Sequence, residues 1–394
     1  MKLFGRKLKF ASPKKVDIVI FDEVNSDLVV RTINKSYSYC VFNQRPEDIW
    51  VGFNVFRKLF DNLSHFQWED ASKHQRGFIV GTIKQLRLLY YKSCLDVINP
   101  KAVVTFIDNS SAFGWLSKHC REYPFIAIQN GSRLSYASSH DSGYYVQHLF
   151  SYGYHEKDLF PRLGYQVENF YPVGSLLASL YFDQQVKHPS HHYDLLIVSA
   201  WRGNIGFQLD VQDTMRSMSI MDRLLSRYIV ENGLKAAVIM RSERGSKDWV
   251  MPEVGMSEEQ YYKNIYRDTV DIVETDFSKR NIFPMMQKSE VIISCLSSAL
   301  LEAYGMKKKI LFCNFTGTDR YHCDFDPAIV TTQPAWDELS IRLNGLLTQK
   351  DDDYQKEHKE MMDYYMAFPD GALTHEYIAI KIDEIIEQNS VISL

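Results

Sequence analysis

Short runs of aliphatic and β-branched residues alternate with amphipathic segments along most of the chain. In the first half, six runs have the length and composition of buried strands, at residues 17–21, 39–43, 102–107, 125–129, 148–152 and 169–173. Apolar residues spaced three or four apart predict a long helix over 78–98, which ends before Pro100. A second helix is expected after Asp108, Asn109 and Ser110, because polar side chains there can cap backbone N–H groups.

The same alternation begins again after a polar, proline-containing stretch near the middle of the chain. Strands are predicted at 194–199, 236–241, 271–274, 291–294 and 309–312. Helices are predicted at 221–231, after Ser257, near 280–288 and at 298–304. Residues 354–388 are predicted to form two further helices, interrupted at 368–371.

Strands that alternate with helices are typical of a mostly parallel sheet covered by helices on both faces. We therefore predict an α/β protein with two Rossmann-like, doubly wound domains that face a cleft. The N-terminal domain is expected over residues 1–187, a linker over 188–193 and the C-terminal domain over 194–370. The last segment, 371–394, is expected to be a helix that packs back on the N-terminal domain.

The composition is that of a globular protein with a sizeable core. Of the 394 residues, 45% are hydrophobic and 24% are charged, and the formal net charge is −4. These values argue against disorder and against a surface that binds nucleic acid throughout. The six cysteines include no C-x-x-C pair, so neither a disulfide framework nor a zinc knuckle is indicated. The acidic pair Asp324 and Asp326 comes late in the second half, and we expect no metal ion or other cofactor.

The start of the chain is basic, with no acidic residue among residues 1–15. This segment lacks the apolar core of a secretory signal, and no window approaches the roughly 18 apolar residues of a membrane span. A cytoplasmic protein is therefore expected. The basic start is interpreted either as a solvated tail or as a peripheral contact with anionic headgroups at the inner face of the membrane.

The most informative stretch is 289–312, where a strand delivers two hydroxyls to a predicted helix start. Ser297 and Ser298 lie at that start, and a helix N-terminus favours a phosphate group. Glu302 follows Ser298 by one helical turn and could accept hydrogen bonds from a ribose diol. The alternative is that the two serines only cap the helix and that Glu302 is solvated.

This stretch resembles the donor-nucleotide half of GT-B glycosyltransferases. The resemblance rests on Ser289–Ser294, Ser297, Ser298, Leu301-Glu302-Ala303, Gly305 and Lys309–Phe312. Residues 103–109 and 126–133 in turn resemble bacterial surface-carbohydrate biosynthesis proteins, which make polysaccharide or lipopolysaccharide. The paired serines are also similar to those of transferases that use CMP-sugars of sialic or octulosonic acid. The resemblance implies a metal-independent glycosyltransferase with a nucleotide-sugar donor.

Further donor-side candidates follow the first two strands of the second half. Arg202, Gly203 and Asn204 come after the first strand, and Arg241 and Arg244 after the second. Ligands of open parallel sheets bind beyond the carboxyl ends of the strands, so these arginines are expected to stabilise the departing phosphate. The alternative for each arginine is a surface ion pair.

On the acceptor side, acidic and amide residues follow strands of the first half. Asp108 is the first candidate for the catalytic base or nucleophile, and Asp22 and Glu23 are the others. Acceptor-binding candidates after the next strand are Gln129, Asn130 and Arg133. The alternative for Asp108 is a purely structural role at the start of the next helix.

Together these features predict transfer of a sugar from a CMP- or UDP-sugar to a glycan acceptor, which could be lipid-linked. Three other functions are compatible with the same residues. Two keep the fold and change the reaction, to nucleotide-sugar epimerisation or polyol-phosphate transfer. The third is a non-catalytic, two-domain ligand-binding or scaffold protein.

Overall fold

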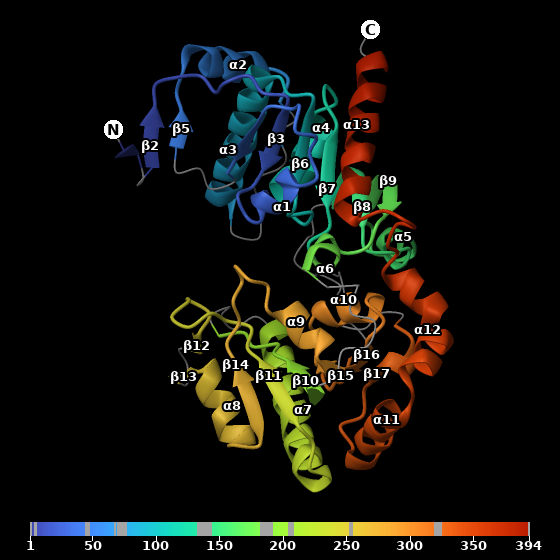
Figure 1. Cartoon of the computed structure of the whole chain (residues 1–394). Helices are drawn as coiled ribbons and strands as arrows, with labels where there is room; N and C mark the ends of the chain where they lie inside the picture. The colour runs from blue at the N-terminus through green and yellow to red at the C-terminus, as the bar shows by residue number, and fades with distance from the viewer. Residues whose placement is uncertain are drawn as a thin grey trace.

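A computed structural model of the chain describes residues 2–3, 6–43, 48–66, 68, 77–131, 144–181, 192–203, 209–251, 255–318 and 325–392. Each half contains a six-stranded sheet in which all neighbouring strands are parallel. Figure 1 shows the two domains one above the other, with the N-terminal domain at the top. The prediction of two Rossmann-like α/β domains is therefore confirmed.

The N-terminal sheet has the order β4-β3-β6-β7-β8-β9. Its strands are β3 (Ile18–Phe21), β4 (Tyr39–Phe42), β6 (Ala102–Thr105), β7 (Phe125–Ile128), β8 (Tyr145–Ser151) and β9 (Gln166–Pro172). All four residues of β3, β6 and β7 are buried, as expected for central strands with both faces covered.

Helices cover both faces of this sheet. On one face, α3 (Phe78–Ile98) and α4 (Ser111–His119) pack on Val19, Phe21, Val103 and Phe125, and α2 (Phe53–Leu63) packs in turn on α3. On the other face, the core contains Leu28 and Val29 of α1 (Ser26–Val30) and Leu176 of α6 (Leu176–Tyr181). The chain also forms α5 (His155–Arg162) between β8 and β9.

The C-terminal sheet has the order β14-β11-β10-β15-β16-β17. Its strands are β10 (Tyr193–Val198), β11 (Ala236–Ile239), β14 (Val270–Val273), β15 (Ser289–Ser294), β16 (Lys309–Cys313) and β17 (Val330–Thr331). In order along the chain this is 3-2-1-4-5-6, the order of dinucleotide-binding domains. The connection reverses direction between β10 and β15, so a crevice is expected beyond the carboxyl ends of these two strands.

In the described part of the C-terminal half, six helices and a short 3-10 turn accompany the sheet. The helices are α7 (Leu209–Asn232), α8 (Glu258–Tyr266), α9 (Ile282–Gln287), α10 (Ala299–Gly305), α11 (Trp336–Thr348) and α12 (Asp351–Tyr365), and the turn is η3 (Pro327–Ile329). Residues of α7, α8 and α11 form the core on one face of the sheet, and residues of α9, α10 and α12 form it on the other. No described helix is both long enough and apolar enough to cross a bilayer.

Two small sheets lie outside these layers. β1 (Lys2–Leu3), β2 (Arg6–Lys9) and β5 (Asp48–Trp50) form one sheet, which leads into α2. β12 (Val250–Met251) pairs with β13 (Met256–Ser257) in the other. The sequence pattern did not indicate either sheet.

The end of the chain returns to the N-terminal domain. The last helix, α13 (Thr374–Ile392), contributes Ile378, Ile382, Ile385 and Ile386 to the core beneath the N-terminal sheet. The Thr374 hydroxyl donates to the Val173 carbonyl at 2.9 Å. The predicted linker lies mostly outside the described residues, and Tyr193 is already the first residue of β10.

Gly153 allows the end of α12 to pack against the N-terminal domain. The Tyr154 N–H donates to the Tyr364 carbonyl at 2.8 Å, and the Ala367 N–H donates to the Tyr152 carbonyl at 2.8 Å. A Cβ atom on Gly153 would lie 2.2 Å from the Tyr364 carbonyl oxygen and 2.5 Å from the Tyr365 carbonyl carbon. These are backbone atoms and cannot rotate away.

We expect Gly153→Ala to lower the free energy of unfolding by about 1–3 kcal/mol, because the two segments must separate to admit a methyl group. Gly345→Ala is the control, since its Cβ would meet nothing within 4 Å in the middle of α11. That change should raise stability by about 0.5–1 kcal/mol. Thermal unfolding of both variants measures the two effects, and equal midpoints would contradict this account of Gly153.

Candidate functional site

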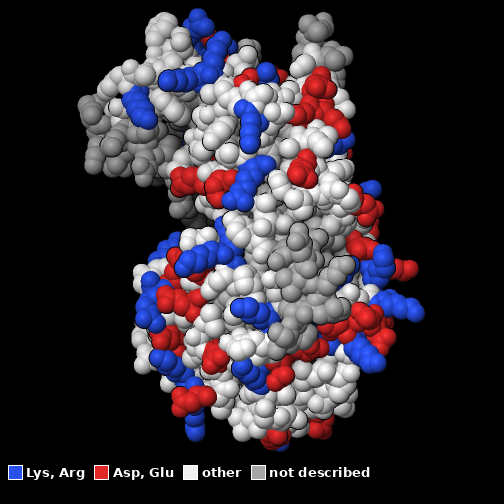
Figure 2. All heavy atoms as spheres, viewed as in Figure 1, with Lys and Arg blue, Asp and Glu red and all other residues white. Residues whose placement is uncertain are grey.

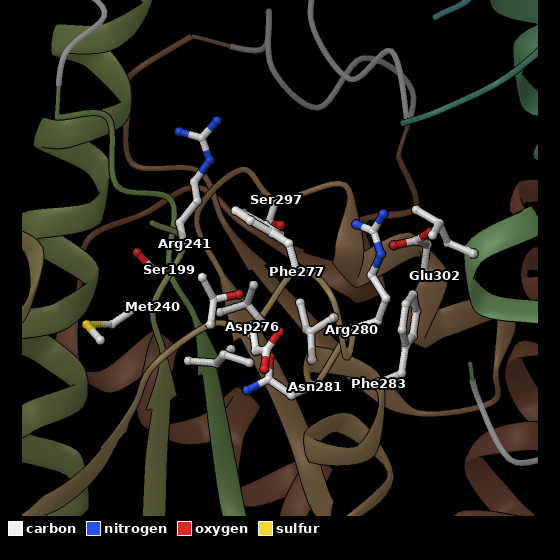
Figure 3. Close-up of a pocket in the computed structure, with 15 residues that line it drawn as sticks. Ser199, Met240, Arg241, Asp276, Phe277, Arg280, Asn281, Phe283, Ser297 and Glu302 are labelled. Atoms are coloured by element: carbon white, nitrogen blue, oxygen red, sulfur yellow. Dashed lines mark hydrogen bonds between the residues drawn. The ribbon is translucent and has the colours of Figure 1, made fainter. Parts of the chain in front are cut away.

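A cavity of about 170 Å³ lies at the point where the C-terminal sheet reverses direction. Its walls come from the carboxyl ends of β10, β11 and β14, from the start of α10 and from Leu177 of α6 in the N-terminal domain. The polar side chains that line it are Ser199, Arg241, Thr275, Asp276, Arg280, Asn281, Ser297 and Glu302 (Figure 3). The cavity therefore occupies the interdomain position predicted from the strand order.

Ser297 and Ser298 lie at the start of α10, as the sequence predicted. Ser297 lines the cavity, and its hydroxyl accepts a hydrogen bond from the Ala299 N–H at 3.3 Å. Ser298 is the N-cap residue, but its side chain makes no capping hydrogen bond. A Cβ atom on Gly131 would lie 3.5 Å from the Ser298 Oγ, so the loop after β7 meets this helix start across the cleft.

Glu302 is not solvated and instead joins the two domains. Its side chain is 7% exposed, and its Oε1 accepts hydrogen bonds from the Ser175 hydroxyl and, at 3.4 Å, from the Tyr152 hydroxyl. Both hydroxyls belong to the N-terminal domain. Burial raises the pKa of Glu302 to about 7, although these hydrogen bonds and the charge of Arg280 act in the opposite direction.

Arg241 is held at the end of β11 by a buried acid. Glu258 accepts hydrogen bonds from the Arg241 N–H at 2.7 Å, from the Ser242 N–H at 2.8 Å and from the Ser199 hydroxyl at 2.5 Å. Burial raises the pKa of Glu258. The carboxyl group thereby ties the loop after β10 to the loop after β11, and it fixes the backbone from which Arg241 extends.

Arg241 lines the cavity, and the charge of Arg202 acts on it. Burial lowers the pKa of Arg241 to about 10, and the charge of Arg202 contributes to this shift. Burial also lowers the pKa of Arg202, whose guanidinium has no hydrogen-bond partner in the part of the chain that the structure describes. An anion between these two cations would relieve their repulsion.

The other donor-side candidates have different surroundings. Gly203 approaches protein backbone, because a Cβ there would lie 2.2 Å from the Asp248 carbonyl oxygen. Arg244 is exposed and pairs with Glu259 at 2.9 Å. It lines an adjacent, more open depression with Glu243, Glu274 and Lys279. Asn204 lies outside the described residues.

Arg280 is a cavity residue that the sequence patterns did not single out. It follows β14 with a left-handed backbone (φ 50°), and its guanidinium donates to the Asn25 side chain in the N-terminal domain. Figure 3 shows this guanidinium directed toward Glu302. Asn25 (φ 54°) and Asp22 (φ 96°) are also left-handed, so strained backbone occurs on both sides of the contact.

Asp108 is buried at the end of β6. It is 1% exposed, and it accepts hydrogen bonds from the Asn130 N–H at 3.2 Å and from the Tyr144 hydroxyl at 3.3 Å. The neighbouring helix α4 is capped by the Ser110 side chain, which accepts from the Phe113 N–H at 3.2 Å. Asp108 therefore joins the loops after β6 and β7 and is not the cap of that helix.

Asp22 and Glu23 follow β3 on the same side of the N-terminal sheet. The Asp22 carboxylate accepts from the Val24 N–H at 2.9 Å, which stabilises the turn. Glu23 is exposed.

The three acceptor-binding candidates also differ in their surroundings. Gln129 is 1% exposed, and its amide nitrogen donates to the Gly131 carbonyl at 3.0 Å and to Glu156 at 2.9 Å. Its amide oxygen accepts from the Tyr152 N–H at 2.8 Å. Because the whole amide is paired inside the domain, an acceptor sugar could bind Gln129 only by replacing these hydrogen bonds. Asn130 is partly exposed, and Arg133 lies outside the described residues.

Several cavity residues follow β14, where the sequence analysis named no candidate. Asp276 accepts from the Ser278 N–H at 3.0 Å and from the Lys279 N–H at 3.1 Å, and the Ser278 hydroxyl is the main cause of its lowered pKa. The Asn281 side chain donates to the Glu274 carbonyl at 2.8 Å. Arg241 was selected because ligands bind beyond the carboxyl ends of parallel strands, and the same reason would have selected this loop. Within the described residues, no cluster of potential ligands suits a metal ion.

Solved structures that are similar over nearly the whole chain include the following three. A putative UDP-N-acetylglucosamine 2-epimerase from Listeria monocytogenes is 12% identical, with a TM-score of 0.56 over 95% of this chain and 98% of that one. The UDP-GlcNAc 2-epimerase from Methanocaldococcus jannaschii is 11% identical, with a TM-score of 0.52 over 96% and 99%. The wall teichoic acid polymerase TagF is 12% identical, with a TM-score of 0.51 over 94% and 90%. The fold is GT-B.

At this level of identity the likeness establishes the fold and nothing finer. No protein-family model matches the sequence, and no curated protein is similar to it. The residues of the cavity therefore carry the case for function.

The raised pKa of Glu302 predicts that the stability of the protein depends on pH. A glutamate in the unfolded chain titrates near 4.5, whereas Glu302 in the folded protein titrates at about 7. The folded state therefore binds the Glu302 proton more tightly than the unfolded state does. The resulting contribution to the free energy of unfolding is fully present below pH 4.5 and is lost as the pH rises through 7. Across this pH range, we expect the free energy of unfolding of the wild type to fall by up to about 3 kcal/mol more than the free energy of unfolding of the Glu302→Gln variant.

Thermal or urea unfolding of the two proteins at a series of pH values measures this difference. Asp222, whose pKa burial also raises to about 7, is present in both proteins and cancels. Parallel pH curves for the two proteins would show that Glu302 is ionised in the folded state.

Proposed function

We propose that this chain is an enzyme of bacterial surface-carbohydrate biosynthesis that acts on a nucleotide-activated sugar, and that it transfers the sugar to a glycan acceptor. The observation that carries the proposal is the pair Arg241 and Arg280 in the lining of a cavity that also contains Ser297 and Glu302, with Arg202 near enough to Arg241 to lower its pKa. Asp276 and Glu302 also line the cavity, but burial of Glu302 favours its neutral form, and the arginine side chains directed into the cavity favour an anionic ligand such as a diphosphate.

In this proposal the C-terminal domain holds the nucleotide. Arg241 and Arg202 would neutralise the phosphates, and Ser297 and Ser298 would donate hydrogen bonds to them. Arg280 would approach from the opposite wall. Glu302 keeps its predicted role toward the ribose only if a ligand hydroxyl joins or replaces the bonds from Ser175 and Tyr152.

UDP is favoured over CMP as the nucleotide. Structures of similar fold were solved with UDP-GlcNAc and UDP in the Methanocaldococcus jannaschii epimerase and with UDP-GlcNAc in the Neisseria meningitidis epimerase. Three cationic side chains also suit two phosphates better than one.

The N-terminal domain would bind the acceptor and supply the base. In the transfer step, the acceptor hydroxyl oxygen forms a bond to the anomeric carbon while the bond to the phosphate oxygen breaks. The hydroxyl proton would pass to the carboxylate of Asp108, or to Asp22 or Glu23. The leaving phosphate takes the electron pair, and the arginines stabilise its added charge.

Epimerisation of a UDP-sugar is the second candidate, because two of the similar structures described above are UDP-GlcNAc 2-epimerases. It would use the same nucleotide site and need no acceptor. Polyol-phosphate transfer is a variant of the first reaction, consistent with the similarity to a teichoic acid polymerase.

Nucleotide binding is the first test. We expect UDP to stabilise the protein against heat more than CMP, CDP or GDP, since a ligand at 100 times its dissociation constant adds about 2.7 kcal/mol. Arg241→Gln should weaken UDP binding at least about tenfold, whereas Arg227→Gln on the outer surface of α7 should leave it unchanged. Failure of every nucleotide to shift the midpoint would leave only the non-catalytic functions.

Turnover is the second test, and it separates the candidate bases. We expect Asp108→Asn to reduce the rate by about 10²–10⁴-fold while UDP binding is retained, because only proton transfer is lost. Asp22→Asn and Glu23→Gln are the matched variants. Release of free nucleotide only with an acceptor indicates transfer, while conversion of the donor without acceptor indicates epimerisation. Normal turnover by Asp108→Asn would move the base to the loop after β3.

A further inference from the structure

The helices α2 and α3 expose many large apolar side chains on the N-terminal domain. In α2, Phe53 is 79% exposed and Phe60 is 68% exposed. In the first half of α3, Ile79 is 72% exposed and Ile83 is 60% exposed. Their exposed apolar neighbours on the same two helices are Phe56, Leu63, Phe78, Val80 and Leu86. A soluble monomer rarely leaves so many such side chains in water without a binding role.

The apolar residues of α2 fall into two groups, one that packs on α3 and one that is exposed. Val55 is buried, and the Asn62 side chain donates to Ser93 at 3.2 Å and to Asp96 at 2.7 Å in α3. Phe53, Phe56, Phe60 and Leu63 recur at intervals of three or four, so they share the adjoining side of the helix. Packing on α3 therefore leaves this stripe of phenylalanines free.

Basic residues accompany the apolar stripe. Arg57 and Lys58 lie on α2 and Lys84 and Arg87 on α3, whereas each helix contains only one acid. Of these acids, Asp61 is exposed, and Asp96 is paired with Lys92 at 3.2 Å. The preceding strand β2 has the sequence Arg-Lys-Leu-Lys. Figure 2 shows basic groups gathered over this end of the N-terminal domain.

We propose that α2 and the first half of α3 form a membrane-docking surface, which inserts its apolar side chains into the interface of an anionic lipid bilayer. Amphipathic helices that carry phenylalanine or leucine on one face and lysine or arginine beside it bind bilayers in this way. The positive side chains match the negative charge of the headgroups. No described helix can span a bilayer, so the protein would lie on the surface.

A second copy of the chain fits this surface less well. A symmetric dimer through α2 would bring Arg57 and Lys58 of one copy close to the same residues of the other. A bilayer avoids this repulsion. α2 also lies at the end of the N-terminal domain away from the C-terminal domain (Figure 1), so docking leaves the cleft accessible. The inference goes beyond the proposed reaction and does not depend on it.

Cosedimentation of the full chain with vesicles tests the proposal. We expect binding to vesicles of phosphatidylcholine with about a quarter phosphatidylglycerol, and much weaker binding to phosphatidylcholine alone or at high salt. Phe56→Ser combined with Phe60→Ser should weaken binding at least about tenfold. Arg57→Gln combined with Lys58→Gln should weaken it several-fold on anionic vesicles only.

The matched control is Ile341→Ser, which removes a side chain of α11 that is 72% exposed on the C-terminal domain. It should bind vesicles like the wild type, and all variants should keep the wild-type circular dichroism because the altered side chains are exposed or, for Lys58, half-buried. Absence of wild-type binding to anionic vesicles would overturn the proposal, as would binding that the α2 variants do not weaken. So would a concentration-dependent dimer, seen by sedimentation velocity, that the phenylalanine variant dissociates while vesicle binding is unchanged.

Discussion

The carboxyl group of Glu302 joins the two domains, and the geometry of the cleft depends on it. Glu302 belongs to α10 of the C-terminal domain, while its partners Ser175 and Tyr152 follow strands of the N-terminal sheet. A buried carboxyl group without hydrogen bonds is costly, so separation of the domains has to be accompanied by solvation of Glu302. Opening of the cleft and the protonation state of this side chain are therefore coupled.

Two further contacts limit how the domains can move. On one side of the cleft, the end of α12 is hydrogen-bonded to the backbone around Gly153, and α13 is buried under the N-terminal sheet. On the other side, Arg280 reaches Asn25 through a single side-chain contact. The backbone connection is the more extensive of the two. Any closing motion is therefore expected to pivot near α12 and to be largest near Arg280.

Much of the fold could be predicted because strands and helices have characteristic local patterns of apolar and polar residues. The helix over 78–98 was predicted with the bounds that the structure has. A helix was also predicted after Ser257, whose hydroxyl accepts a hydrogen bond from the Gln260 N–H. The pairing of β2 with β5 was missed because a few residues pair across about forty positions of sequence. The same reason explains Arg280, whose partner Asn25 is 255 positions away, and the burial of Glu302.

The rule that ligands bind beyond the carboxyl ends of parallel strands pointed to the cavity, but it could not separate binding residues from structural ones. Gln129 follows β7 and Glu258 begins α8, and the hydrogen-bonding groups of both are satisfied by neighbouring loops. A ligand could use them only by breaking those bonds, and each broken bond would leave a buried group unpaired. Arg241 and Arg280 also follow strands but extend from the loops into the cavity. Glu258 and Gln129 therefore hold their loops in place, and Glu258 fixes the backbone from which Arg241 can meet a ligand.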